Sequence, residues 1–187
     1  SEGLGLDAVS EGELLTAIKG GVPNEKIVFH GNNKSDKELE FAVRNNIKVI
    51  VDNDYDLERL DEISNSFNHD LEIMIRFTPG IECHTHEYIR TGSFDSKFGF
   101  GIEYLNILFN RISNTKHLKL KGLHAHIGSQ IFELDPHKDL GEIMVKVILD
   151  AKKFGHNIEE LNVGGGLGIR YTESDDPPSI DEWVKTI

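Results

Sequence analysis

The chain has 187 residues, a formal net charge of -12 and 38% hydrophobic residues. This length allows one domain with a sizeable core, although two small domains would also fit. The excess of acidic residues argues against a nucleic-acid-binding protein, because such proteins bind phosphates through clustered Lys and Arg. The single cysteine, Cys83, excludes an internal disulfide and suits a reducing compartment.

The sequence also lacks the signals of a membrane or secreted protein. No apolar run approaches the ~20 residues that a membrane-spanning helix needs. The first residues do not show the basic, apolar and small-residue order that is typical of a signal peptide. We therefore expect a cytoplasmic protein with neither a membrane nor a nucleic acid as its partner.

Short apolar segments alternate with longer amphipathic segments along the chain. The first apolar segment, residues 4–9, precedes Ser10, a plausible helix N-cap, and Glu13 completes the pattern of a capping box. Ser35 or Asp36 is the expected cap of a later helix. The other expected strands are residues 26–31, 47–53, 71–79, 118–128 and 158–166, and the expected helices are residues 14–21, 37–46, 55–67, 102–114 and 139–155, followed by a tail that ends with residues 179–187.

These segments predict six strand-then-helix units. The strands are near-continuous apolar runs, which is typical of parallel strands that are buried on both faces. Two parallel architectures compete at this stage, the closed eight-stranded barrel and the open, doubly wound sheet. Six units fit an open sheet comfortably, whereas a closed barrel needs eight units and roughly 250 residues.

Polar and glycine-containing stretches follow most of the expected strands. Both parallel architectures place their ligand sites at the carboxyl edge of the sheet. We therefore expect the functional groups to lie in these stretches, which are residues 30–35, 52–56, 76–80, 126–130 and 162–168.

A run of three glycines, Gly164, Gly165 and Gly166, follows the last expected strand. Without a Cβ atom, such residues let backbone N–H groups approach an anion closely. The dinucleotide pattern G-x-G-x-x-G does not fit, because Ile169 and Tyr171 occupy the sixth position in the two possible registers, and the P-loop pattern is also missing. A phosphate cup of another kind and a simple tight turn both remain open.

Two histidines, His124 and His126, are spaced to share one face of an expected strand. Such a pair can bind a metal, and residues 83–87 repeat the spacing in CHTHE, but no second Cys or H-x-x-x-H helix supports a zinc site. Alternatively, one histidine faces a planar ligand while Ser129 and nearby amides hold a phosphate. The other histidine would then belong to the core or the rim.

Four blocks resemble the motifs of the fold type III pyridoxal phosphate-dependent decarboxylases, in the order of that family. They are GLDAVSEGEL, VFHGNNKSDKEL, HTHEYIRTGSFDSKFG, and GLHAHIGSQIF followed by LNVGGGLGIRY, and they span almost the whole chain. Within the family, HTHEYIRTG together with HIGSQI is most similar to the branch that acts on meso-diaminopimelate.

The resemblance implies an α/β fold, the parallel (β/α)8 TIM barrel of the alanine racemase-like type. It also implies that the barrel is incomplete, with about strands 2 to 7 and their helices present. Residues 1–187 would then be part of a pyridoxal phosphate-binding barrel domain. The first and last barrel strands and the C-terminal β-domain of the family would be absent from this sequence.

The same resemblance assigns the glycines and histidine to the cofactor, pyridoxal 5'-phosphate. His126 would stack on the pyridine ring. Ser129 and the backbone of Gly164, Gly165 and Gly166 would bind the phosphate through hydroxyl and N–H donors.

Two charged residues complete the implied site. Arg76 would lie near the phenolic side of the ring, although an ion pair at the rim is an alternative role for it. Asp7 would lie near the Schiff-base lysine. In the family this lysine comes from a segment before the position of Ser1, so neither Lys34 nor Lys97 takes its place. We therefore expect no catalytic residue in this sequence, no metal, and no activity of these residues alone.

The implied activity of the complete protein is decarboxylation of the amino acid meso-diaminopimelate to L-lysine and CO2, carried out by a homodimer. Three alternatives stay open at this stage. They are a decarboxylase for ornithine, arginine or carboxynorspermidine, a non-catalytic barrel that only binds pyridoxal phosphate, and a metal-dependent barrel hydrolase.

Overall fold

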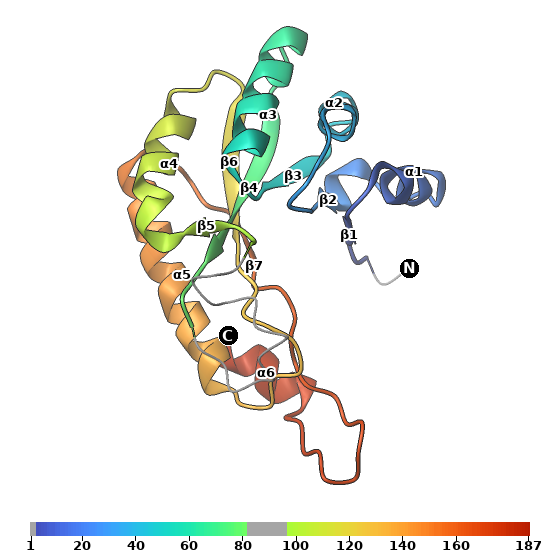
Figure 1. The fold of residues 1–187 in the computed structure, drawn as a ribbon, viewed down its shortest axis with the longest axis vertical. Coiled ribbons are helices and arrows are strands. Elements are labelled where there is room, and N and C mark those ends of the chain that lie inside the picture. The colour runs from blue at the N-terminus through green and yellow to red at the C-terminus, as the bar shows by residue number, and fades with distance from the viewer. Residues whose placement is uncertain (1–2, 82–96) are drawn as a thin grey trace.

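The computed structural model describes residues 3–81 and 97–187, and it shows helices arranged around a curled sheet (Figure 1). The strands are β1 (Leu6–Ala8), β2 (Ile27–Phe29), β3 (Lys48–Val51), β4 (Leu71–Thr78), β5 (Phe100–Gly101), β6 (Leu118–His124) and β7 (Glu160–Asn162). The helices are α1 (Glu11–Lys19), α2 (Asp36–Arg44), α3 (Asp54–Phe67), α4 (Leu105–Ser113), α5 (Asp135–Lys153) and α6 (Ile180–Thr186), with 3-10 turns at Asn24–Lys26 and Ile102–Tyr104.

The strand order explains why the sheet is part of a barrel. The strands pair in the order β1-β2-β3-β4-β6-β7, and every pair is parallel. A doubly wound sheet reverses its order near the middle, whereas a barrel adds each strand next to the previous one. The order observed here never reverses, so the six expected strands form the incomplete barrel and not the open sheet. The short β5, which pairs with β4 beside the main strand order, was not predicted.

An ion pair across the interior shows how strongly the sheet curls. Lys48 on β3 binds the carboxylate of Glu160 on β7, and its Nζ lies 3.6 Å from Oε2 of Glu72 on β4. In the sheet, β3 and β7 are separated by β4 and β6. Side chains on these two strands can meet only because the sheet bends around a common interior.

The core lies between the strands and the helices that cover them. All four residues of β3 are buried, and so are Phe29 on β2, Ile73 on β4 and Phe109 on α4. Burying one such large apolar side chain contributes roughly 1.5–3 kcal/mol relative to leaving it exposed. The apolar runs at β3 and β4 thus correspond to strands that are buried on both faces, whereas the strands at the two ends of the described sheet, β1 and β7, are largely exposed.

Serine caps begin α1 and α2 close to where the sequence predicts. At α2, Ser35 and Glu38 form a complete capping box. At α1, the Ser10 hydroxyl accepts the Glu13 N–H at 3.3 Å, but the Glu13 carboxylate accepts the N–H of Val9 at 2.7 Å. The expected capping box at Ser10 is therefore only half formed.

Several expected boundaries are wrong, and one of them matters for the site. Helix α5 begins at Asp135, with a proline in its first turn, and so starts earlier than the expected residue 139. Strand β6 ends at His124, so His126 lies beyond the strand. The prediction that these two histidines share a strand face is therefore wrong.

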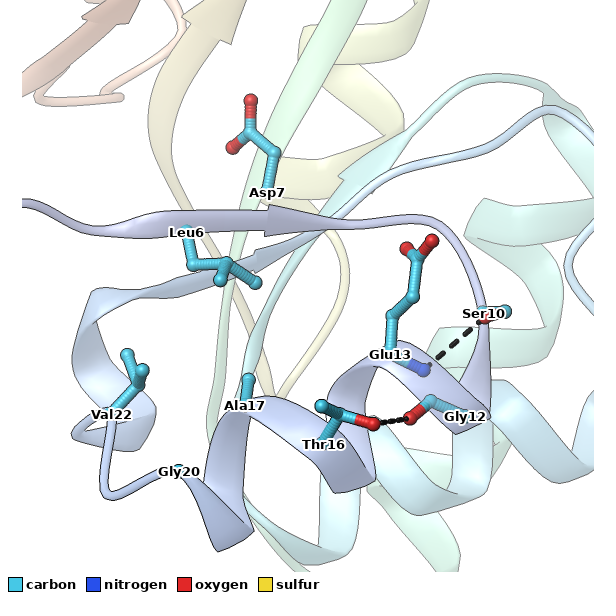
Figure 2. A pocket seen from close by; sticks show the side chains of 9 residues that line it. All are labelled: Leu6, Asp7, Ser10, Gly12, Glu13, Thr16, Ala17, Gly20 and Val22. Atoms are coloured by element: carbon cyan, nitrogen blue, oxygen red, sulfur yellow. Dashed lines mark hydrogen bonds between the residues drawn. The ribbon is translucent and has the colours of Figure 1, made fainter.

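The edge strand β1 leaves a groove of about 570 Å³ between itself and α1. Figure 2 shows Leu6 pointing from β1 toward α1, with Ala17 and Val22 also lining this space. Leu4 and Val9, on either side of β1, expose 80% and 59% of their surfaces, which is a large apolar exposure for an edge strand. In the part of the chain that the structure describes, no helix combines the length and hydrophobicity needed to cross a membrane.

Candidate functional site at the carboxyl edge of the sheet

The loops that follow β6 and β7 are joined by two kinds of hydrogen bond. The Ile131 N–H donates to the Gly166 carbonyl at 2.8 Å, and the Gly168 N–H donates to the Ile131 carbonyl at 2.9 Å. The Gln130 amide adds a pair of bonds to the backbone of Ile169, at 2.9 and 3.1 Å. These bonds hold two segments that are far apart in sequence in one fixed arrangement.

The three glycines have different structural reasons to be glycine. Gly166 has φ +107°, and a Cβ atom there would lie 2.3 Å from the carbonyl oxygen of Gly128. Gly164 has φ +69°, and its Cβ would lie 2.6 Å from Nδ1 of His126. Gly165 is exposed, and a Cβ there would meet nothing within 4 Å. The outer two glycines therefore serve close packing, whereas the middle one borders open space.

His126 is half-buried beside this glycine turn. The Gly165 N–H donates to its Nδ1 at 3.4 Å, which leaves the ring proton on Nε2. Burial, with a smaller contribution from the charge of Arg76, lowers the pKa of His126. The imidazole is therefore neutral, and its Nδ1 faces the glycine turn.

His124 is buried and has a structural role. Its Nδ1 donates to the Asn162 carbonyl at 3.1 Å, and the Asn162 side-chain oxygen accepts the Gly164 N–H at 2.9 Å. Burial, followed by the nearby His30, lowers the pKa of His124 to about 3. His124 is thus a neutral donor that connects the end of β6 to the turn after β7, which fits the expected core or rim histidine.

The zinc alternative gains no support from the described residues. Residues 3–81 and 97–187 contain no group of three or more His, Cys, Asp or Glu side chains that could hold a metal ion. The CHTHE stretch of residues 83–87, and most of the HTHEYIRTGSFDSKFG block, lie outside the described residues.

Ser129 lies in the same loop as Gly128 and is exposed. Because Gly128 packs against Gly166, the structure places the Ser129 loop beside the glycine turn. The sequence predicted this neighbourhood from two motifs that are more than thirty residues apart.

Arg76, near the end of β4, forms an ion pair at the rim, which was the alternative role that we considered for it from the sequence. Its Nη1 donates to Oδ1 of Asp52 at 3.3 Å, and its guanidinium carbon lies 4.4 Å from the centre of the Phe98 ring. The side chain is only 12% exposed. Burial lowers the pKa of Arg76, opposed by Asp52, but a guanidinium keeps its charge in a protein.

Asp7, on β1, points away from α1, opposite to Leu6 (Figure 2). Its Oδ2 lies 3.4 Å from Nε2 of His30, and this contact lowers the pKa of Asp7. The His30 ring in turn meets the His124 ring edge-on, with centroids 4.8 Å apart. Asp7 is therefore connected through His30 to the end of β6.

A buried charge network at the same edge was missed by the sequence analysis. Nζ of Lys34 lies 2.6 Å from Oδ2 of Asp56, and both side chains are almost completely buried. The Asp52 N–H donates to the same Asp56 oxygen at 3.0 Å. Burial lowers the pKa of Lys34 and raises that of Asp56. The polar stretches 30–35 and 52–56 were correctly placed, but which side chains pair depends on strand register and not on local pattern.

A curled parallel sheet with loops, imidazoles and a guanidinium gathered at its carboxyl edge defines an α/β-barrel protein with a ligand site at that edge. Residues 1–187 match the family model described as the pyridoxal binding domain of pyridoxal-dependent decarboxylases. The chain belongs to this family, which confirms the resemblance seen in the sequence and the pyridoxal cofactor that it implied.

Individual relatives agree with this assignment. The chain is 53% identical to the diaminopimelate decarboxylase of Synechocystis sp., an alignment that covers 98% of this chain and 41% of that protein. The crystal structure of the Helicobacter pylori diaminopimelate decarboxylase complexed with L-lysine superposes with a TM-score of 0.92 at 32% identity, covering 97% of this chain and 46% of that one.

A more distant structure confirms the fold alone. The arginine decarboxylase of Paramecium bursaria Chlorella virus matches with a TM-score of 0.78 at 17% identity, over 98% of this chain and 46% of that one. The chain thus spans less than half the length of the relatives that it matches.

Proposed function

We propose that this chain provides part of the cofactor-binding barrel domain of a decarboxylase that converts meso-diaminopimelate to L-lysine and CO2. The observation that supports the proposal is the hydrogen bonding between the loop after β6 and the loop after β7, which contains Gly164–Gly166. It brings two of the family motifs together at the carboxyl edge of the barrel. The diaminopimelate decarboxylases of Synechocystis sp. and Bacillus subtilis, 53% and 43% identical to the chain, support the choice of substrate.

The phosphate of the cofactor would be held by Ser129 and by the backbone of Gly164, Gly165 and Gly166. Positive φ angles at Gly164 and Gly166 shape the backbone into a concave turn. Because the Gly164 N–H donates to the Asn162 side chain at 2.9 Å and the Gly165 N–H donates to Nδ1 of His126 at 3.4 Å, these two N–H groups would exchange their present acceptors for the phosphate. The space at the Gly165 Cβ position is open, so a phosphate can approach this backbone closely. The residues present therefore fit a phosphorylated cofactor.

The pyridine ring would lie between His126 and the charged groups of the rim. A neutral imidazole can pack flat against an aromatic ring, and His126 lies directly beside the glycine turn that would hold the phosphate. Arg76, on β4, would supply a permanent cation for an oxygen of the ring, and Asp7, on the edge strand β1, would supply a carboxylate near the lysine that binds the cofactor. When bound, the cofactor accepts the electrons that decarboxylation releases, and these side chains hold it in position.

The remaining groups would come from the rest of a longer protein. The relatives are more than twice as long as this chain. We propose that residues 1–187 form part of the barrel domain, and that the lysine that binds the cofactor covalently lies in the remaining part. The complete protein would be a cytoplasmic homodimer, as the family resemblance implies, and its mass in solution by light scattering tests the dimer.

A substrate comparison tests the proposed activity. The full-length protein, purified with pyridoxal 5'-phosphate, is incubated with meso-diaminopimelate, ornithine or arginine, and amine products and CO2 are measured. We expect lysine and CO2 in equal amounts from meso-diaminopimelate and little product from the other two. Preferred turnover of ornithine or arginine would contradict the substrate, and cofactor binding without CO2 release from any of them would contradict catalysis.

A further inference from the structure

Asp52 occupies a special position at the carboxyl end of β3. Its side chain is 1% exposed, although an aspartate that follows a strand normally faces water. The two carboxylate oxygens have different partners: Oδ1 accepts from Nη1 of Arg76 at 3.3 Å, and Oδ2 accepts the Gly99 N–H at 3.1 Å. A buried carboxylate with two hydrogen bonds in two directions has a fixed orientation.

The backbone of Asp52 is fixed as well. Its N–H donates to Oδ2 of Asp56 at 3.0 Å, and the same oxygen binds the ammonium group of Lys34 at 2.6 Å. Lys34 also donates to the Gly31 carbonyl. The carboxylate that faces Arg76 is therefore anchored by the loop after β2 and by the first turn of α3.

The segment at residues 98–99 encloses Arg76 from another side. The Phe98 ring lies over the guanidinium, and Gly99 has φ +72°. A Cβ at Gly99 would lie 3.0 Å from the Arg76 carbonyl oxygen and 3.1 Å from its Cγ. Arg76 is thus enclosed by the Asp52 carboxylate, the Phe98 ring and the closely packed backbone of Gly99.

We propose that Asp52 is a positioning residue that holds the Arg76 guanidinium in the orientation in which it meets the cofactor. This inference rests on the proposed function, because it gives Arg76 the pyridoxal ring as its partner. An arginine side chain is long and rotatable, so its planar donors act on one atom only when something else fixes the plane. The bond to Asp52 and the ring of Phe98 supply that restraint.

A simpler role for Asp52 would be to neutralise a buried cation. The two roles differ in how they tolerate a displaced charge. Asp52→Glu keeps the charge but moves the carboxylate by one methylene, so it should restore a purely electrostatic function and fail to restore a positional one. Asp52→Asn keeps the shape and removes the charge.

The test uses the full-length protein with pyridoxal 5'-phosphate. The dissociation constant of the cofactor and the pH dependence of its visible absorption band are measured for Asp52→Asn, Asp52→Glu, Arg76→Lys and the double variant Asp52→Asn/Arg76→Lys. Asp36→Asn is the matched control, because it breaks an Asp–Arg pair on the exposed surface, where Asp36 binds Arg59 at 2.9 Å.

We expect each single variant at Asp52 or Arg76 to bind the cofactor about tenfold more weakly, the size of one lost charge-assisted hydrogen bond. Each should also shift the pH at which the absorption band changes. Asp52→Glu should differ from the wild type in both properties, as Asp52→Asn does. The double variant should bind the cofactor no more than about twofold more weakly than whichever of its two single variants binds more weakly, because both changes remove the same interaction. The Asp36→Asn control should match the wild type.

Three results would overturn the inference. Unchanged affinity and band in Asp52→Asn, additive effects in the double variant, or full recovery in Asp52→Glu would each show that Asp52 does not act by position, while the proposed function would stand. If the wild-type protein itself takes up no pyridoxal 5'-phosphate, the proposed function fails and the inference fails with it. Should Asp52→Asn not fold, Asp52→Glu decides alone, since it preserves the charge balance of the site.

Discussion

Replacing Gly166 with alanine tests the packing of the two loops most sharply. The new Cβ would lie 2.3 Å from the Gly128 carbonyl oxygen, and real Cβ atoms essentially never come within 3.0 Å of a neighbour. The atom it meets is backbone, which cannot rotate away. An alanine at positive φ costs about 1–2 kcal/mol, and overpacking adds typically 1–3 kcal/mol. We therefore expect Gly166→Ala to lower the free energy of unfolding by roughly 2–5 kcal/mol.

Urea-induced unfolding of the wild type and the variant measures this loss, with the slope checked for a constant value. Gly165→Ala is the matched control in the same turn, because its Cβ meets nothing within 4 Å. The control should lose no more than about 0.5 kcal/mol. Equal losses in the two variants, or no loss in Gly166→Ala, would show that the loops after β6 and β7 are not packed as described.

Three other changes test the charged groups. Because the folded protein keeps His124 neutral down to about pH 3 while the unfolded chain is protonated near its ordinary pKa of 6.5, stability should fall as pH decreases through this range. The loss from this group at pH 5 should be about 2 kcal/mol, and urea unfolding at pH 7 and 5 should show it in the wild type but not in His124→Asn. Lys34→Met leaves the buried Asp56 without its cation and should cost about 3–5 kcal/mol, most of which Lys34→Met/Asp56→Leu should recover in a thermal-melt cycle. Glu160→Gln should cost at most about 1 kcal/mol, decreasing with added salt, since the Glu160 that binds Lys48 is half exposed.

The sequence predicts the strands of this fold better than their arrangement. Six apolar runs identify six parallel strands, because a parallel strand that belongs in a covered sheet leaves a local composition signal, even at β1 and β7, which are largely exposed here. These runs alone do not decide between a barrel and an open sheet, because the two differ in the order in which the strands pair, and pairing order leaves no local pattern in the sequence. The bend that brings Lys48 to Glu160 depends on residues 112 positions apart, which no local pattern reveals.

The candidate site divides in a similar way. The glycine run and the stretch around His126 are visible as turns after strands, and the structure places them together. The ion pair of Arg76 with Asp52, and that of Lys34 with Asp56, join residues that are 24 and 22 positions apart. Many acidic residues in this chain could have been those partners, so only the strand register selects them.

The most direct measurement of the central claim is a titration of the full-length protein and its Gly165→Ala variant with pyridoxal 5'-phosphate, followed by absorbance and combined with a thermal melt. If the middle glycine lines the phosphate site, the variant should melt like the wild type and bind the cofactor about tenfold more weakly. Equal affinity in the two proteins would contradict a phosphate held by this turn.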